Sequence, residues 1–253
     1  MILPKRDDVF HKIQLFRLLT AIIDSDISKH VFFKGGTATS MLGFLDRFSI
    51  DLDFDLEKNT SKNEIGAELK NIFKKLDLEI DKKSSKTLYY ILKYRSKQGL
   101  RNSIKLSFIY NIYKSNIYKP QYLSEIDRFV NCQTIETMFA NKLVAITDRY
   151  KKTKTIAGRD LYDIHHCFIN GYRYRNEIIE ERTGKNSIDY FKDLIKFIDK
   201  KIDNKVIDED LNFLLQPESF RKIRSRLKSE TLMLLKQEIA KFEFKPLVPT
   251  LLA

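Results

Sequence analysis

Apolar and polar residues alternate along the chain with two different periods, and each period predicts a type of element. Apolar side chains at positions 9, 10, 13, 15, 16, 18 and 19 fit one face of a helix over residues 9–23. Between residues 48 and 56 every second residue is apolar, and a serine or an aspartate stands between them. This period of two predicts a strand with one buried face and one acidic face. A short apolar run at residues 31–33 ends at Gly35-Gly36 and predicts a strand that enters a glycine turn.

The remaining patterns divide the chain into a mixed half and a helical half. Helices are predicted over residues 37–45 and 62–76, and strands over 86–95 and 102–113 with a turn around Gly99 between them. After the turn at Lys119-Pro120 the pattern is helical only, over residues 134–150, 160–169, 187–202 and 217–242. We therefore predict an α+β fold with two domains: a mixed sheet flanked by helices in residues 1–125, and a helical bundle in residues 126–253.

The acidic strand face carries candidate chemistry. Asp51 and Asp53 are two residues apart on one strand, so both side chains project from the same face. Carboxylate oxygens of this kind suit Mg²⁺ or Mn²⁺. Two such ions held by carboxylates supply much of the charge neutralisation that nucleotidyl transfer needs. An Asp-x-Asp strand alone is usually just a solvated face, so its neighbours decide the interpretation.

Gly35-Gly36 is the neighbour that favours a phosphate ligand. Backbone without a Cβ atom can approach a phosphate closely, and a helix that follows offers unpaired N–H groups. Further candidates for contacting the nucleotide or orienting its ligands are Lys34, Thr37, Arg47 and Ser49. A Gly-Gly pair after a strand is usually only a turn. The combination of strand, Gly-Gly, short helix and acidic strand predicts a site for a metal-bound nucleoside triphosphate.

These residues also carry a family resemblance. The segments Lys34-Gly35-Gly36-Thr37-Ala38 and Arg47-Phe48-Ser49-Ile50-Asp51-Leu52-Asp53-Phe54 closely resemble the signature of the AbiEii/AbiGii toxin family, in the DNA polymerase β-like nucleotidyltransferase superfamily. A second block resembles the family's downstream motifs: Lys142-Leu143-Val144-Ala145, Arg149 and Arg159-Asp160-Leu161-Tyr162-Asp163-Ile164. The two blocks cover roughly residues 31–56 and 134–166.

The resemblance implies a polymerase β-like mixed sheet followed by a helical bundle. It implies a nucleotidyltransferase that is the toxin of a toxin–antitoxin pair, and some relatives are thought to add nucleotides to the acceptor end of tRNA. The positions that correspond to functional ones are Ser49, Asp51, Asp53, Lys142 and Asp163, with Asp160 as an addition.

The second block has local support, and the first lacks one expected acid. Lys142 and Arg149 share a helix face, and Asp160 and Asp163 are neighbours on the next predicted helix. Without the resemblance, a surface ion-pair network would explain them. Related enzymes often carry a third carboxylate on a later strand as base for the acceptor hydroxyl, and that position is expected to hold Ser107. Either Asp160 or Asp163 then replaces it, or the acceptor chemistry differs. The site is accordingly expected between the two domains.

Composition adds little to this interpretation. The net charge of +12 fits a polyanionic partner, but it fits a lysine-coated surface equally well. Cys132 and Cys167 form no CxxC pair, which favours a reducing compartment. No secretion signal and no apolar run of about 20 residues is present. We therefore expect a cytoplasmic protein with no membrane partner. The basic segments 151–154, 171–175 and 221–228 are RNA contacts or ordinary solvated surface.

Three functions follow from the sequence. The first is a metal-dependent nucleotidyltransferase that moves a nucleotide from a triphosphate to an RNA acceptor, with tRNA as the expected class and an antitoxin as partner. The second is a nucleotide- or RNA-binding module with a degenerate transferase site, which the serine at position 107 favours. The third is a transferase that attaches nucleotide or phosphate to a protein hydroxyl.

Overall fold

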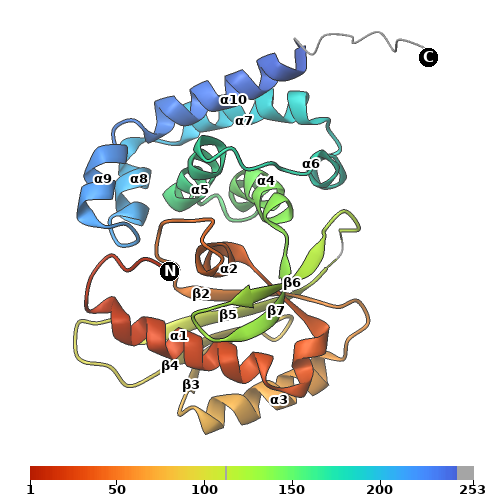
Figure 1. Ribbon diagram of the computed structural model, residues 1–253, viewed down its shortest axis with the longest axis vertical. Helices are drawn as coiled ribbons and strands as arrows, with labels where there is room; N and C mark the ends of the chain where they lie inside the picture. Colours follow the sequence, from red (N-terminus) through yellow and green to blue (C-terminus); the bar gives the residue numbers. More distant parts are fainter. Residues whose placement is uncertain (112, 244–253) are drawn as a thin grey trace.

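A mixed seven-stranded sheet forms the first half of the protein in a computed structural model, which describes residues 1–111 and 113–243 (Figure 1). The strands are β1 (Val31–Lys34), β2 (Asp51–Leu56), β3 (Glu79–Lys83), β4 (Leu88–Lys93), β5 (Ser103–Tyr110), β6 (Tyr118–Leu123) and β7 (Arg128–Gln133). Their spatial order is β3-β4-β5-β2-β1-β7-β6. β2 is central, antiparallel to β1 and parallel to β5, so side chains from three strands meet around its acidic face.

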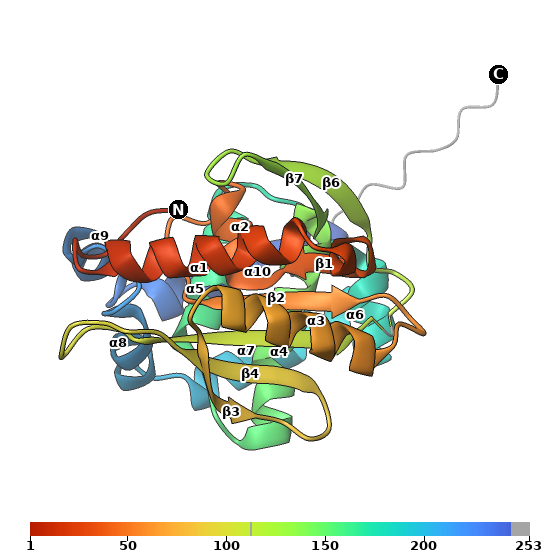
Figure 2. The ribbon, with the colours of Figure 1, turned by 90° about the horizontal axis from the view of Figure 1, so that it is seen from below.

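Helices cover both faces of this sheet. Helices α1 (Asp8–Ile23) and α3 (Lys62–Lys75) lie on one face, which Figure 2 shows from below. Leu15 and Leu19 of α1 are fully buried in one apolar core with Phe33 and Phe54 of the central strands. The short helix η1 (Asp26–His30) leads into β1, and α2 (Gly35–Met41) follows β1 directly. Because α2 lies on the opposite face from α1, it stands between the sheet and the second half of the chain (Figure 1).

The second half is a helical bundle with its own core. Its helices are α4 (Ile135–Thr153), α5 (Gly158–Ile169), α6 (Asn176–Thr183), α7 (Ser187–Lys201), α8 (Asn204–Leu211), α9 (Pro217–Ile223) and α10 (Leu227–Glu243). Phe139, Leu161 and Phe191 belong to its apolar core. The Thr134 hydroxyl caps α4 by accepting from the backbone N–H of Thr137, so the chain passes directly from β7 into the bundle.

The predicted α+β class is confirmed, and each predicted helix or strand has that structure over most of its length. The predicted strand 102–113 includes residue 112, which lies outside the described residues. The helix predicted over 217–242 is wrong in one respect, because α9 ends at Ile223 and α10 begins at Leu227. Short helices α6 and α8 were not predicted. Among the described residues, no helix combines the length and the apolar character that a membrane crossing needs.

Three strands escaped prediction for a physical reason. β3 is exposed along its whole length, so it carries no apolar period. β6 is an edge strand that contains Pro120, a residue that predicts a turn but is tolerated at a sheet edge. β7 exposes Phe129, so its apolar residues do not mark a single buried face. Strands therefore continue past residue 125, and we propose that the division between the two domains falls at Thr134, between β7 and α4.

Candidate active site

Strand pairing places Asp51 and Asp53 side by side on an accessible face. The register sets Asp53 opposite Lys34 of β1 and opposite Ser107 of β5, and sets Asp51 opposite Lys105. The two aspartates are half-buried, whereas Leu52 between them is fully buried in the core. The alternation predicted from the sequence therefore holds, and it leaves two carboxylates open to a ligand.

The glycine pair lies directly against these side chains. Gly35 has φ +77°, and a Cβ atom added there would stand 3.0 Å from Asp53 Oδ2. A Cβ atom at Gly36 would stand 2.9 Å from both Ser49 Oγ and Arg47 Nη2. No side chain fits at either position without moving these groups. Gly35-Gly36, Ser49 and the two aspartates thus form one wall of the candidate site, and its binding of a triphosphate stays a prediction.

Thr37 and Lys34 are engaged within the protein. The buried Thr37 hydroxyl contacts the carbonyl oxygen of Asp51 and lies 2.9 Å from Ser49 Oγ, so it ties α2 to the acidic strand. Lys34 Nζ lies 2.5 Å from Asp55 Oδ1. Asp55 Oδ2 also accepts from Tyr118 and Gln133, so this third aspartate of β2 is saturated by protein donors. Thr37 and Lys34 therefore contact groups of the protein and support the wall rather than face a ligand.

The downstream block forms a buried ion network that joins the two halves of the chain. Arg47 donates from Nε and Nη2 to the two carboxylate oxygens of Asp163, at 2.5 and 2.7 Å. Lys142 Nζ lies 3.0 Å from Asp160 Oδ1 and 3.0 Å from Asp163 Oδ2. Arg149 Nε donates to the second oxygen of Asp160 at 3.0 Å. The ion-pair network considered from the sequence exists, but its carboxylates are buried and it includes Arg47 from the first half.

Electrostatics keep these groups charged. Burial alone would raise the pKa of Asp160, but Lys142 and Arg149 lower it to about 2. Burial also opposes the charge of Asp163, yet Arg47 and Lys142 lower its pKa. Each of the four carboxylate oxygens of Asp160 and Asp163 contacts a cationic side chain. In this arrangement neither carboxylate has an oxygen available to accept a proton from an acceptor hydroxyl. Both carboxylates instead contact Lys142: burial opposes the charge of its ammonium, but Asp160 and Asp163 raise its pKa and keep it protonated.

The lowered pKa of buried Asp160 leads to an expected pH dependence of stability, for which the exposed Lys93–Asp81 ion pair serves as control. The lowered pKa of Asp160 means that it stabilises the fold above its unfolded value of 3.8, and that this contribution is lost as the pH falls toward about 2. We expect the unfolding free energies of wild type and Asp160→Asn to differ most near neutral pH and to converge as the pH falls from about 4 to about 2. Urea titrations at several pH values measure this. Asp81→Asn, which removes the exposed Lys93–Asp81 pair, should show little difference at any pH. A pH-independent gap for Asp160→Asn would contradict the expectation.

Two residues of β5 complete the site, and sequence reasoning found only one of them. Ser107 Oγ donates to Asp53 Oδ1 at 2.5 Å, which confirms that a serine occupies the strand position next to the metal-ligand candidates. Lys105 Nζ lies 2.9 Å from Asp51 Oδ2. Burial would lower the pKa of Lys105, but Asp51 and Asp53 raise it. Lys105 was missed because its pairing with Asp51 depends on the register of two strands that are distant in sequence.

The donor set fits a divalent metal that arrives with its substrate. Among the described residues, no group of three or more histidine, cysteine, aspartate or glutamate side chains is placed to hold a metal ion. Asp51 and Asp53 offer two hard oxygen ligands, and Mg²⁺ commonly binds through one or two carboxylates together with substrate phosphates and waters. The two aspartates therefore fit Mg²⁺ or Mn²⁺ bound to a triphosphate, rather than a metal held by protein alone.

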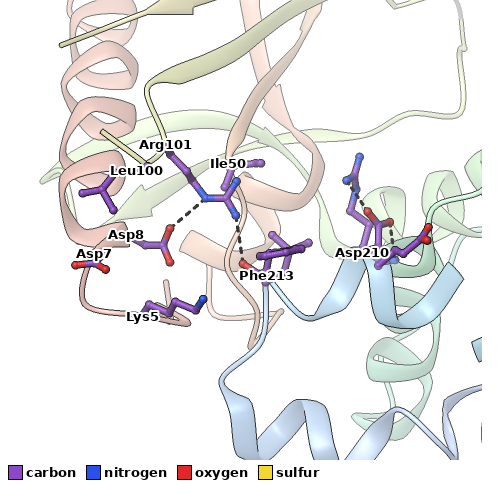
Figure 3. Close-up of a pocket in the computed structure, with 12 residues that line it drawn as sticks. Lys5, Asp7, Asp8, Ile50, Leu100, Arg101, Asp210 and Phe213 are labelled. Carbon is purple, nitrogen blue, oxygen red and sulfur yellow. Dashed lines mark hydrogen bonds and ion pairs between the residues drawn. The ribbon is translucent and has the colours of Figure 1, made fainter. Parts of the chain in front are cut away.

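A cavity of about 520 Å³ is lined by residues from both halves of the chain (Figure 3). It is bordered by Ile50, the residue before Asp51, and by Arg159, the residue before Asp160. Arg101 donates to Asp8 at 3.1 Å across one side of it. The remaining lining residues that matter here are the ion pair Arg159–Asp210 and the half-exposed ring of Phe213. Its donors, acceptors and aromatic ring are groups that suit the nucleoside part of a nucleotide, although Asp51 and Asp53 do not line it.

Comparison with known proteins places the chain among nucleotidyltransferases. The family model described as nucleotidyl transferase AbiEii toxin, type IV toxin–antitoxin system, matches residues 17–240. No curated protein matches the sequence. JHP933 from Helicobacter pylori has a similar structure, with a TM-score of 0.56, 21% identity, and 94% of this chain and 96% of that one covered. MenT4, a nucleotidyltransferase toxin from Mycobacterium tuberculosis, gives a TM-score of 0.55 at 15% identity, with 91% and 84% covered. At these identities the two structures support the fold alone.

Proposed function

The chain belongs to the AbiEii nucleotidyltransferase toxin family, and from this premise we propose that it transfers a nucleotide from a metal-bound nucleoside triphosphate to an RNA acceptor, with tRNA as the first candidate. The observation that carries the proposal is the pair of half-buried carboxylates, Asp51 and Asp53, against the side-chain-free backbone of Gly35-Gly36. Carboxylates hold metal and bare backbone admits phosphate, so this wall supplies both requirements of a triphosphate site.

The residues of this chain divide the work by position. Asp51 and Asp53 would hold Mg²⁺ or Mn²⁺, which neutralises charge on the triphosphate when bound. Gly35-Gly36 would face the phosphates with backbone alone, and the buried Ser49 hydroxyl would support this backbone from beside Gly36. Lys142, fixed by two carboxylates, presents a permanent cation from the helical half. Arg47 stays buried behind the wall and holds that half in place.

Strand β5 of this chain, which is described over its whole length, lacks a carboxylate that could act as base for the acceptor hydroxyl. The β5 positions next to Asp51 and Asp53 hold Lys105 and Ser107, so no carboxylate of this strand faces the metal candidates. Deprotonation of the acceptor hydroxyl would therefore depend on the metal-bound site and solvent. The net charge of +12 supports recruitment of a polyanion such as RNA. An antitoxin partner and a cytoplasmic location complete the proposal.

An incorporation assay tests the proposal. Purified protein is incubated with Mg²⁺, total RNA and each of the four α-labelled triphosphates in turn, and RNA and protein are resolved separately. We expect label in the tRNA size range with one or a few of the triphosphates. Label in a protein band would instead support a protein-modifying transferase. Calorimetric binding of a triphosphate without any incorporation would support the binding module that Ser107 suggests.

A further inference from the structure

One side chain beside the aspartates has a charge that a metal site does not need. Asp51 and Asp53 each have one oxygen held by β5, Asp53 by the neutral hydroxyl of Ser107 and Asp51 by the ammonium of Lys105. The ammonium lies 2.9 Å from Asp51 Oδ2, within ion-pair distance. A divalent ion that approached Asp51 from solvent would meet this cation already in place.

The other cations around the wall are committed elsewhere. Lys34 is paired with Asp55, Arg47 with Asp163, and Lys142 with both acids of α5. Lys105 has Asp51 as its partner, and its side chain is 36% exposed, so it can leave Asp51 and turn toward another anion. It is therefore the cation of the wall best able to exchange one anion for another during binding.

We propose that Lys105 is a positioning residue. Its ammonium pairs with Asp51 until a metal-bound triphosphate binds, and it then pairs with a phosphate oxygen instead. This inference deepens the proposed triphosphate site and rests on it. Without nucleotide, two carboxylates and one ammonium leave a small net negative charge, which attracts a divalent ion weakly. The phosphate oxygens of the triphosphate can replace Asp51 as the ion-pair partner of Lys105, and Asp51 is then free to bind the metal. The metal therefore binds together with the nucleotide, and its binding to the nucleotide-free site is weak.

Manganese binding tests this without any transfer reaction. The full-length protein is titrated with Mn²⁺ in the absence of nucleotide, and free Mn²⁺ is followed by electron paramagnetic resonance. We expect Lys105→Met to bind Mn²⁺ at least about tenfold more tightly than wild type, because the competing charge is gone. Lys105→Arg should behave like wild type. Lys93→Met removes the same charge from neighbouring β4, where the lysine pairs with Asp81, and should leave the affinity unchanged.

Two further measurements locate the effect. Adding Asp51→Asn to Lys105→Met should abolish the gained affinity, which assigns it to this carboxylate. Adding a non-hydrolysable triphosphate should tighten Mn²⁺ binding more in wild type than in Lys105→Met. Equal nucleotide-free affinities for wild type, Lys105→Met and Lys93→Met would overturn the inference. Because no transfer is measured, tighter binding by Lys105→Met would stand even if no RNA were ever labelled, so the two proposals can fail separately.

Discussion

Replacing Asp53 by asparagine is expected to lower nucleotide transfer at least about a thousandfold while leaving the fold intact. The substitution keeps size and shape, and the Ser107 hydroxyl can still donate to the amide oxygen. It removes one of the two negative charges that would hold a divalent ion. Asp55, the third carboxylate of β2, cannot replace it, because Lys34, Tyr118 and Gln133 already occupy its oxygens. Single-turnover incorporation of labelled triphosphate, at saturating RNA, measures the loss.

Controls separate lost chemistry from lost structure. Asp81→Asn makes the same chemical change on exposed strand β3 and should retain the wild-type rate. The melting temperature of Asp53→Asn should be close to that of wild type, since the carboxylate is half-buried and the nearby cation, Lys105, keeps its ion pair with Asp51. A folded Asp53→Asn protein with a wild-type rate would remove Asp53 from the metal site and leave the proposed function without its main support.

Sequence patterns could group the residues of this wall because they all lie between residues 35 and 53 of the chain. Period-two alternation fixed which residues of β2 face away from the core, and the glycine pair precedes β2 with only the rest of α2 and a loop between them. The same patterns could not locate Lys105, because its contact with Asp51 depends on the parallel register of strands separated by more than 50 residues. The alternation of residues within a strand predicts the sheet face on which a side chain lies. It does not predict which strand pairs with that strand, or in which register.

The roles of the downstream residues were also beyond the sequence. Helical spacing put Asp160 and Asp163 on one face, which is where the structure has them, but spacing does not report burial. Only the fold shows that Arg47, 116 residues earlier, closes over Asp163 and leaves no oxygen free for catalysis. A motif match names functional positions, whereas tertiary contacts distinguish a group that reacts from one that holds another in place.

This distinction leads to the largest expected stability effect. Asp163→Ala would leave the guanidinium of Arg47, which is 2% exposed, buried without its counter-charge. Removing one partner of a buried ion pair typically costs about 3–5 kcal/mol. For a chain of this size the melting temperature should fall by on the order of 10 °C. Thermal and urea unfolding measure the change. Asp193→Ala, which removes an exposed partner of Lys185, should cost less than about 1 kcal/mol.

A double replacement then separates stability from activity. Arg47→Met combined with Asp163→Leu removes both charges, so no ion is stranded in the interior, and a large part of the stability lost in Asp163→Ala should return. Transfer should not return, because Lys142 keeps only Asp160 as an anchor and the guanidinium that packs against Gly36 and Ser49 is gone. Recovery of both properties would show that the network serves folding alone. Recovery of stability without transfer would support the proposal that the buried charges joining the two halves also hold Lys142 in place for the triphosphate.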